Sequence, residues 1–270
     1  MIELLFFFLL GAIIGSFLNC IIYRLEIDES FTKGRSYCPK CKHVLGFFDL
    51  VPILSFVSLK GKCRYCKENI SWQYPIVEFF TAMIFVLNYM NFFNNSILFI
   101  FSCIISAFLI VTFVYDLKHC LVPVDFVYWG IGLTFIFHLI NFYFVFSQAN
   151  PNNIGIAYGF WLYVRPYLLG ALLPFLFFFI LHFISQGRWM GLGDSKIGFL
   201  LGLILGYPNV LISLLLAVFL GAIMGLILIF SKQKGLKSEM PFGPFLIFGF
   251  YLMFFFGEIF IEIYHNLFLW

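Results

Sequence analysis

The sequence predicts an all-α polytopic membrane protein with about eight transmembrane helices and a small cytoplasmic zinc-binding insert. The 270 residues are 63% hydrophobic and 11% charged, and they include 41 Phe, a composition far more apolar than that of a water-soluble domain. The apolar stretches are long runs without alternation, which indicates helices and not a β-barrel. The one sizeable polar segment contains two Cys-x2-Cys pairs.

The apolar runs predict eight membrane segments, at residues 2–23, 75–92, 96–115, 124–147, 163–184, 195–207, 209–230 and 244–264. The first run could be a signal peptide, but it lacks a basic n-region and a small-residue cleavage site, so we interpret it as a retained helix. The sixth run would measure about 20 Å as a helix, against a hydrocarbon core of about 30 Å. We therefore expect it to be tilted, recessed or broken. This organisation divides the chain into a first transmembrane helix (1–23), an insert (24–74) and a membrane core (75–270).

The basic residues predict the orientation in the membrane. Nine of the 16 Lys and Arg lie between residues 24 and 67, and only Arg165 falls on the opposite side of the predicted spans. The others on the majority side are Lys118, Arg188, Lys196, Lys232, Lys234 and Lys237. Because Lys and Arg accumulate in cytoplasmic loops, we expect the insert to be cytoplasmic and both chain termini to lie outside.

Small residues recur at helical spacing in several of the runs. Gly198, Gly202 and Gly206 are four residues apart, as are Gly11 and Gly15. In lipid such stripes let helix backbones approach closely. We expect ordinary close packing along them.

The insert contains Cys38, Cys41, Cys63 and Cys66. Two such pairs can supply four thiolates to a tetrahedral zinc ion. A segment this small cannot bury a large core, so a structural metal would stabilise it. Disulfides and redox chemistry are the alternatives, and a cytoplasmic location disfavours disulfides. His43 stands beside the first pair, and we expect it at the surface because four cysteines already complete the site.

Two aspartates lie at the edges of apolar runs, Asp116 at the end of the third and Asp194 at the start of the sixth. An ionised side chain within a membrane costs on the order of 3 kcal/mol, and the predicted orientation puts both at the cytoplasmic face. Two carboxylates that share one proton can activate a water and hydrogen-bond a scissile carbonyl, as in aspartic peptidases. Taken singly, each could instead be a local cap or ion-pair partner. Gly191 and Gly193 precede Asp194, and an extended backbone there would admit water.

Other ionisable residues in the apolar runs receive weaker assignments. Glu78 lies just inside the second run and could line the same cavity as the aspartates. Asp125 is expected to cap the start of the fourth run. For His138 and His182 we expect packing roles with one hydrogen bond each.

With these residues identified, the chain resembles the type IV prepilin peptidases, bacterial enzymes that are both leader peptidases and N-methyltransferases. The resemblance runs nearly end to end. It rests on GAIIGSFLNCIIYRL near the start, CPKC and GKCRYC in the insert, the YD at 115–116, GLGDSKIGFLLGLILG from 191 and MPFGPFL at 240–246. A Pro-Asp pair usually follows the first aspartate in this family, whereas here the order is Pro123-Val124-Asp125.

The resemblance implies that Asp116 and Asp194 form the catalytic dyad of an aspartic endopeptidase in the bacterial inner membrane. The substrates would be prepilins or pseudopilins, cleaved after a Gly at the cytoplasmic face. S-adenosylmethionine would then donate a methyl group to the new N-terminal residue. The PFGP stretch at 241–244 would lie near the active site, where its backbone could bind extended substrate. Membrane lipid is the other expected partner, and no nucleic acid is expected.

Two other function classes remain open on the sequence alone. A transporter or proton-coupled channel could use paired membrane carboxylates, and it predicts acids near the midplane and an inverted repeat. A zinc-bearing scaffold without activity predicts that loss of either aspartate is silent.

Overall fold

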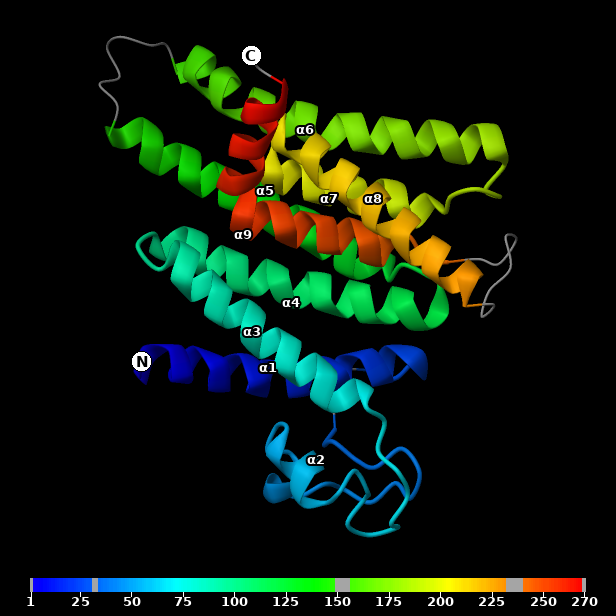
Figure 1. Cartoon of the computed structure of the whole chain (residues 1–270). Helices are drawn as coiled ribbons and strands as arrows, with labels where there is room; N and C mark the ends of the chain where they lie inside the picture. The colour runs from blue at the N-terminus through cyan, green and yellow to red at the C-terminus, as the bar shows by residue number, and fades with distance from the viewer. Residues whose placement is uncertain (1, 31–33, 149–155, 232–239, 269–270) are drawn as a thin grey trace. The chain divides into compact units, whose positions relative to one another are not determined.

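The computed structural model describes residues 2–30, 34–148, 156–231 and 240–268, and the regular structure in these ranges is almost entirely helical (Figure 1). Seven described helices are long and apolar enough to cross a membrane. They are α1 (Ile2–Glu26), α3 (Gln73–Phe92), α4 (Ser96–His119), α5 (Val124–Gln148), α6 (Ile156–Ser185), α8 (Asn209–Phe230) and α9 (Gly243–Phe268). The predicted helical membrane protein is confirmed. Lys232, Lys234 and Lys237, which contributed to the predicted orientation, lie outside the described residues.

The short sixth apolar run forms a short helix. This helix, α7 (Leu192–Leu205), has 14 residues and would measure about 21 Å. It ends where Gly206 adopts φ +71° and donates its N–H to the carbonyl of Gly202 at 2.9 Å. Apolar side chains such as Ile197, Leu200 and Leu201 are fully buried, so α7 is a core helix of the protein.

The chain forms two compact units, Met1–Val111 and Thr112–Trp270. The division falls inside α4, and the last turns of this helix therefore belong to the second unit. Asp116 and Asp194 are both in this second unit, whereas the four paired cysteines are in the first.

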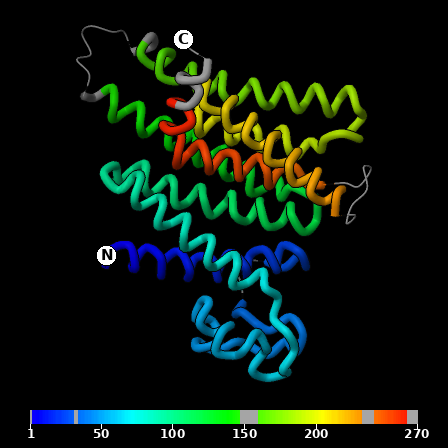
Figure 2. Tube along the Cα trace, in the orientation of Figure 1, coloured from blue at the N-terminus to red at the C-terminus, as the bar shows by residue number. Residues whose placement is uncertain are grey.

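In the first unit α1 packs closely on α3, as Figure 2 shows for the two traces. A Cβ atom at Gly11 would lie 2.7 Å from the Cα of Ala82, and one at Gly15 would lie 2.8 Å from the Cα of Glu78. The glycine stripe of the first apolar run is therefore a helix contact, as expected. Between these helices the insert holds a 3-10 helix, η1 (Phe47–Asp49), and the short α2 (Leu54–Ser58).

In the second unit α7 packs against α6 along its own glycines. Gly202 faces the backbone of Gly170 so closely that a side chain could not fit, and Gly198 faces Phe178 and Pro174. The glycine stripe of α7 is thus confirmed as a packing surface. α8 and α9 pack on each other in the same way, with Gly249 against the carbonyl of Ser213.

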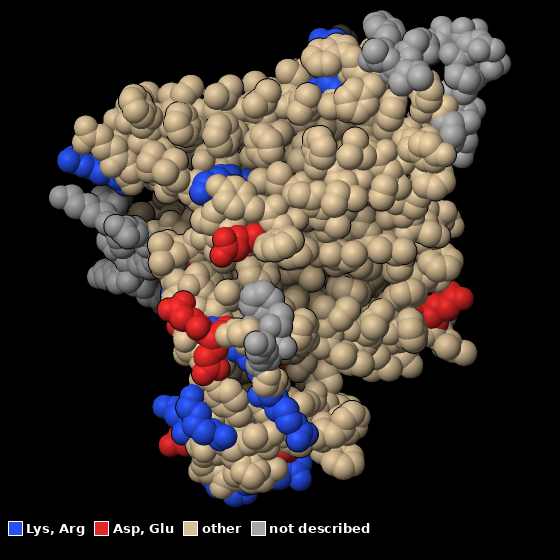
Figure 3. Space-filling model, turned by 180° about the vertical axis from the view of Figure 1, so that it is seen from behind, with Lys and Arg blue, Asp and Glu red and all other residues tan. Residues whose placement is uncertain are grey.

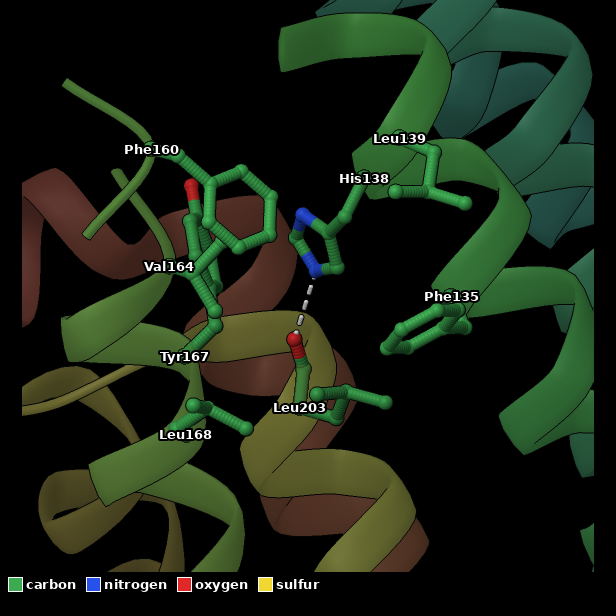
Figure 4. Close-up of a pocket in the computed structure, with 8 residues that line it drawn as sticks. All are labelled: Phe135, His138, Leu139, Phe160, Val164, Tyr167, Leu168 and Leu203. Atoms are coloured by element: carbon green, nitrogen blue, oxygen red, sulfur yellow. Dashed lines mark hydrogen bonds between the residues drawn. The ribbon is translucent and has the colours of Figure 1, made fainter. Parts of the chain in front are cut away.

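His138 on α5 satisfies a carbonyl at the end of α7 (Figure 4). Its Nε2 lies 2.9 Å from the carbonyl oxygen of Leu203, and its Nδ1 lies 3.3 Å from the hydroxyl of Tyr163. Because a carbonyl can only accept, Nε2 carries the proton and Tyr163 donates to Nδ1. Asn141 donates in turn to the Tyr163 oxygen at 2.9 Å. His138 therefore makes two hydrogen bonds where the sequence suggested one.

Candidate active site and metal centre

Asp116 lies in the last turn of α4 and is only 3% exposed. The helix ends just beyond it, where Cys120 adopts φ +52° and donates its N–H to the Asp116 carbonyl at 2.8 Å. The Oδ2 atom of Asp116 is buried and accepts no hydrogen bond of normal geometry from the described residues. Such an oxygen is costly unless it serves a water or a substrate.

Asp194 is the third residue of α7, whose N-cap is Gly191. It is 9% exposed, and its carboxylate interacts with the backbone N–H of Gly191. The first turn of a helix stabilises a carboxylate through its unsatisfied N–H groups and dipole. Lys196, the neighbour considered as an ion-pair partner, instead lies over the ring of Tyr128 at 5.1 Å.

The two carboxylates are close enough to interact electrostatically. They come from segments far apart in the sequence, the end of α4 and the start of α7. The start of α9 completes the site, because a Cβ atom at Gly243 would overlap Oδ2 of Asp116 and lie 3.0 Å from Cδ1 of Ile197. The N–H of Gly243 also attracts the negative charge of Asp116. The PFGP stretch therefore lies beside Asp116, where we expected it.

The two glycines before Asp194 have different surroundings. Gly191 is extended, with φ −75° and ψ 153°, and a Cβ there would make an ordinary contact 3.8 Å from Asp194 Oδ2. Gly193 is already helical, contrary to the extended backbone we expected across this stretch. A Cβ at Gly193 would come within 2.6 Å of the Val122 Cβ, so the loop after α4 packs directly on the first turn of α7. Val122 was missed by sequence reasoning, because nothing marks one apolar residue in a loop as a site contact.

Glu78 belongs to the first unit, and its carboxylate is engaged there. Its Oε2 accepts the backbone N–H of Ile53 at 2.7 Å, and Ser16 donates a further hydrogen bond. In its own unit Glu78 thus joins α3 to the insert, and the cavity role that we considered for it stays a prediction. His182 likewise has a local role, with Nδ1 2.8 Å from the carbonyl of Met190.

The four paired cysteines come together in the insert. The Sγ atoms of Cys38, Cys41, Cys63 and Cys66 all lie within 4.8 Å of one another. Four thiolates at about 2.3 Å from a tetrahedral zinc are about 3.8 Å apart, so a small closure would complete such a site. His43 is not among these ligands. Its exposed ring lies against that of Tyr65, at a centroid distance of 3.6 Å and an interplanar angle of 35°.

The two cysteine turns share one backbone design. In the first, Cys38 donates its N–H to His43 and accepts the N–H of Lys42, which has φ +57°. In the second, Cys63 donates to Glu68 and accepts from Lys67, which has φ +61°. Each turn is closed by an isolated bridge, Tyr37 to Val44 and Lys62 to Asn69. Because the two turns have the same backbone conformation, both pairs of thiols point toward the same place.

The environment of Cys63 favours a thiolate, the form that binds metal. Burial opposes ionisation of this thiol and is the largest single influence. Hydrogen bonds from the backbone N–H groups of Cys66 and Tyr65, together with those from the side chains of Cys66 and Cys38, outweigh it and lower the pKa to about 7. The donor set therefore fits zinc in both number and chemistry.

Comparisons with known proteins cover most of the chain. Residues 9–92 match the family described as Bacterial Peptidase A24 N-terminal domain, and residues 103–226 match the Type IV leader peptidase family. No solved structure matches the chain.

Several curated relatives are named prepilin leader peptidase/N-methyltransferase. The protein of Bacillus subtilis (strain 168) is 31% identical across 98% of this chain and 98% of its own length. The protein of Aeromonas salmonicida (strain A449) is 30% identical, covering 88% of this chain and 86% of its own. That of Myxococcus xanthus (strain DK1622) is 32% identical over 87% of this chain, which spans 66% of the relative's length. The chain belongs to the type IV leader peptidase family.

Proposed function

We propose that this chain cleaves the leader of type IV prepilins or pseudopilins with Asp116 and Asp194 as its catalytic dyad, and that it methylates the new N-terminus. The activity class follows from family membership. The roles of the two aspartates are supported by one structural observation above all. Two buried carboxylates from distant helix ends interact in one place, and Oδ2 of Asp116 accepts no hydrogen bond of normal geometry from the described residues.

In the proposed mechanism the two carboxylates share a single proton, because two negative charges cannot easily coexist in a poorly solvated site. The ionised carboxylate takes a proton from water, and the water oxygen bonds to the scissile carbonyl carbon. The protonated carboxylate hydrogen-bonds the carbonyl oxygen as charge develops there. Collapse breaks the C–N bond, and a carboxyl proton passes to the leaving amine. The dyad titrates as a pair, so neither residue has a fixed role as acid or base.

Gly243 is proposed to make room for Asp116 rather than to bind substrate. The strand-binding role expected for PFGP needs a free backbone edge, but the N–H of Gly243 faces the Asp116 carboxylate. A side chain at this position would instead displace Oδ2. Space for the carboxylate is therefore the simpler function of this glycine.

We further propose a structural zinc ion on Cys38, Cys41, Cys63 and Cys66, which would stabilise the insert. When bound, S-adenosylmethionine supplies the methyl group for the second activity. The charge distribution supports placement of the insert and dyad at the cytoplasmic face of a bacterial inner membrane, with both chain termini outside.

The ion-transport alternative receives little support from the geometry. It predicts carboxylates near the membrane midplane, whereas Asp116 is in the last turn of one helix and Asp194 in the first turn of another. The cysteine cluster also has no evident part in transport.

The decisive test uses a prepilin substrate with a Gly-Phe junction, and mass spectrometry to detect cleavage and methylation separately. Asp116→Asn and Asp194→Asn should each lower the cleavage rate by about 10²–10⁴-fold, with zinc content unchanged. Asp125→Asn is the matched control, because Asp125 lies in the first turn of α5 and has no proposed catalytic role. Near-normal cleavage by either dyad variant would refute the assignment.

A further inference from the structure

The insert exposes a set of large apolar side chains that its own fold leaves uncovered. Phe47 is 80% exposed, Phe48 76%, Leu54 67%, Val57 66% and Trp72 70%. We call these five residues the insert apolar surface. Phe47 and Phe48 are on η1, which packs against α2, and Leu54 and Val57 are three residues apart on α2. Exposed apolar groups of this size in a polar segment indicate an interaction surface.

A hydrogen bond to a membrane helix fixes the depth of this surface. Ile53, the N-cap of α2, donates its N–H to Glu78. Glu78 lies five residues after Gln73, or about 8 Å along the candidate membrane helix α3, and it also contacts Ser16 on α1. Ser16 is about 15 Å before the end of α1 at Glu26. The start of α2 therefore lies beside the membrane-crossing parts of both helices, at the level of lipid headgroups or below.

The backbone at this anchor is held in an unfavourable conformation. Ile53 is β-branched yet adopts φ +61°, a region that such residues rarely occupy. A strained conformation persists only where surrounding contacts impose it, and the bond to the buried Glu78 is such a contact. This hydrogen bond therefore holds α2 in a defined position against α3.

The charges around this surface match an anionic membrane. Residues 24–74 contain nine Lys or Arg against five Asp or Glu, and Figure 3 shows Lys and Arg gathered over the insert. Lys60, Lys62 and Lys67 follow α2 without an intervening acid and are exposed, whereas Arg64 among them is paired with Asp49 at 2.8 Å. Basic side chains near the bilayer attract anionic headgroups, and Trp favours the interface. A basic prepilin leader would be repelled by the same charges.

We propose that the insert apolar surface is embedded in the headgroup–acyl boundary of an anionic phospholipid bilayer. Phe47, Phe48, Leu54, Val57 and Trp72 bury their side chains there. The exposed lysines that follow α2, Lys60, Lys62 and Lys67, bind lipid phosphates. The insert is then a monotopic membrane element held between two transmembrane helices. This interaction does not depend on the peptidase assignment.

Trp72 provides a native reporter for the test. The full chain, with Trp129, Trp161, Trp189 and Trp270 replaced by Phe, is placed in vesicles of phosphatidylglycerol and phosphatidylcholine. Lipids brominated on the acyl chain should quench Trp72 emission at least twofold. The control carries Trp72→Phe and Lys40→Trp, a polar exposed site in the first cysteine turn, and should be quenched much less. Equal quenching of both probes by aqueous acrylamide, with no effect of bromolipid on Trp72, overturns the proposal.

A second measurement uses the unmodified chain, so its result does not depend on whether the tryptophan variants fold correctly. A photoactivatable phosphatidylglycerol with a diazirine in its acyl chain should label residues 47–57 as well as the lipid-exposed α8. Labelling of α8 alone overturns the proposal. So does a Trp72 that stays in water in vesicles and becomes protected only when a prepilin is added, because the occupant is then the pilin helix.

Discussion

At the scale of single residues, the site depends on glycines, which leave room for neighbouring side chains. Gly193 admits Val122, and Gly243 admits the Asp116 carboxylate, with almost no spare room at either contact. Gly191 has no such neighbour. Two of the three glycines near the dyad are therefore needed for packing in the native backbone, and the third is not.

Gly193→Ala should reduce cleavage about tenfold or more, because overpacking costs about 1–3 kcal/mol and would push the first turn of α7 away from the α4 loop. Gly191→Ala should stay within about threefold of the normal rate, since its Cβ meets only ordinary contacts. Adding Val122→Ala to Gly193→Ala should restore much of the loss in the same mass-spectrometric assay. A Gly191→Ala defect as large as that of Gly193→Ala would contradict this steric account.

Gly243→Val should abolish cleavage while the protein still folds and binds zinc, because the new side chain occupies the space of Asp116 Oδ2. Zinc content and elution as a single species would report on folding, and leader removal on the site. Normal cleavage by this variant would show that the start of α9 has no part in the active site.

At the scale of elements, α7 carries Asp194 at one end and an unusual cap at the other. A helix that ends within an apolar bundle leaves carbonyls that water cannot satisfy. The His138 ring supplies one donor to Leu203, and the Asn141–Tyr163 pair fixes the ring's tautomer. This hydrogen-bond chain compensates for the short length of α7.

His138→Leu should therefore destabilise the protein by about 1–3 kcal/mol, the cost of a buried carbonyl without a donor. Thermal unfolding in detergent would measure it, and His138→Gln, which keeps a side-chain N–H, should lose less. The His138 ring also packs on Tyr167, with 4.1 Å between the ring centroids. Equal losses for the two variants would mean that this packing, and not the hydrogen bond, is what matters.

The sequence was sufficient for the helices and for their glycine-lined packing faces, but not for most individual side-chain contacts. Long apolar runs, the short sixth run and the glycine stripes predicted the elements because length and spacing are local properties. The proximity of Asp116 and Asp194 was expected from charge asymmetry and resemblance. The contact of Val122 with Gly193, the carbonyl bound by His138 and the use of Glu78 by the insert were not predictable, since each depends on tertiary packing of residues distant in sequence.

At the scale of the whole molecule, the two proposed sites belong to different compact units. The aspartates and the start of α9 are in the second unit, and the cysteine cluster is in the first. Damage to the cysteines should therefore act on the insert first and leave the described contacts of the dyad in place.

Cys63→Ser should reduce zinc content to background and impair methylation more than cleavage. Metal analysis, together with the separate cleavage and methylation readouts, would measure this difference. Tyr65→Phe, in the same turn but not a ligand, is the matched control and should keep its zinc. Equal loss of both activities with the helices still folded would show that the insert is required for leader removal itself.

Lys42 and Lys67, one in each cysteine turn, both adopt a positive φ. This shared strain suggests which part of the protein would change first when zinc is scarce. Lys42 and Lys67 hold conformations that cost non-glycine residues about 1 kcal/mol each, and zinc binding would offset that cost in both turns at once. Without the ion, both hairpins would relax together, while the glycine-packed helices kept their contacts. The supply of zinc would then set how much of the enzyme carries an ordered insert.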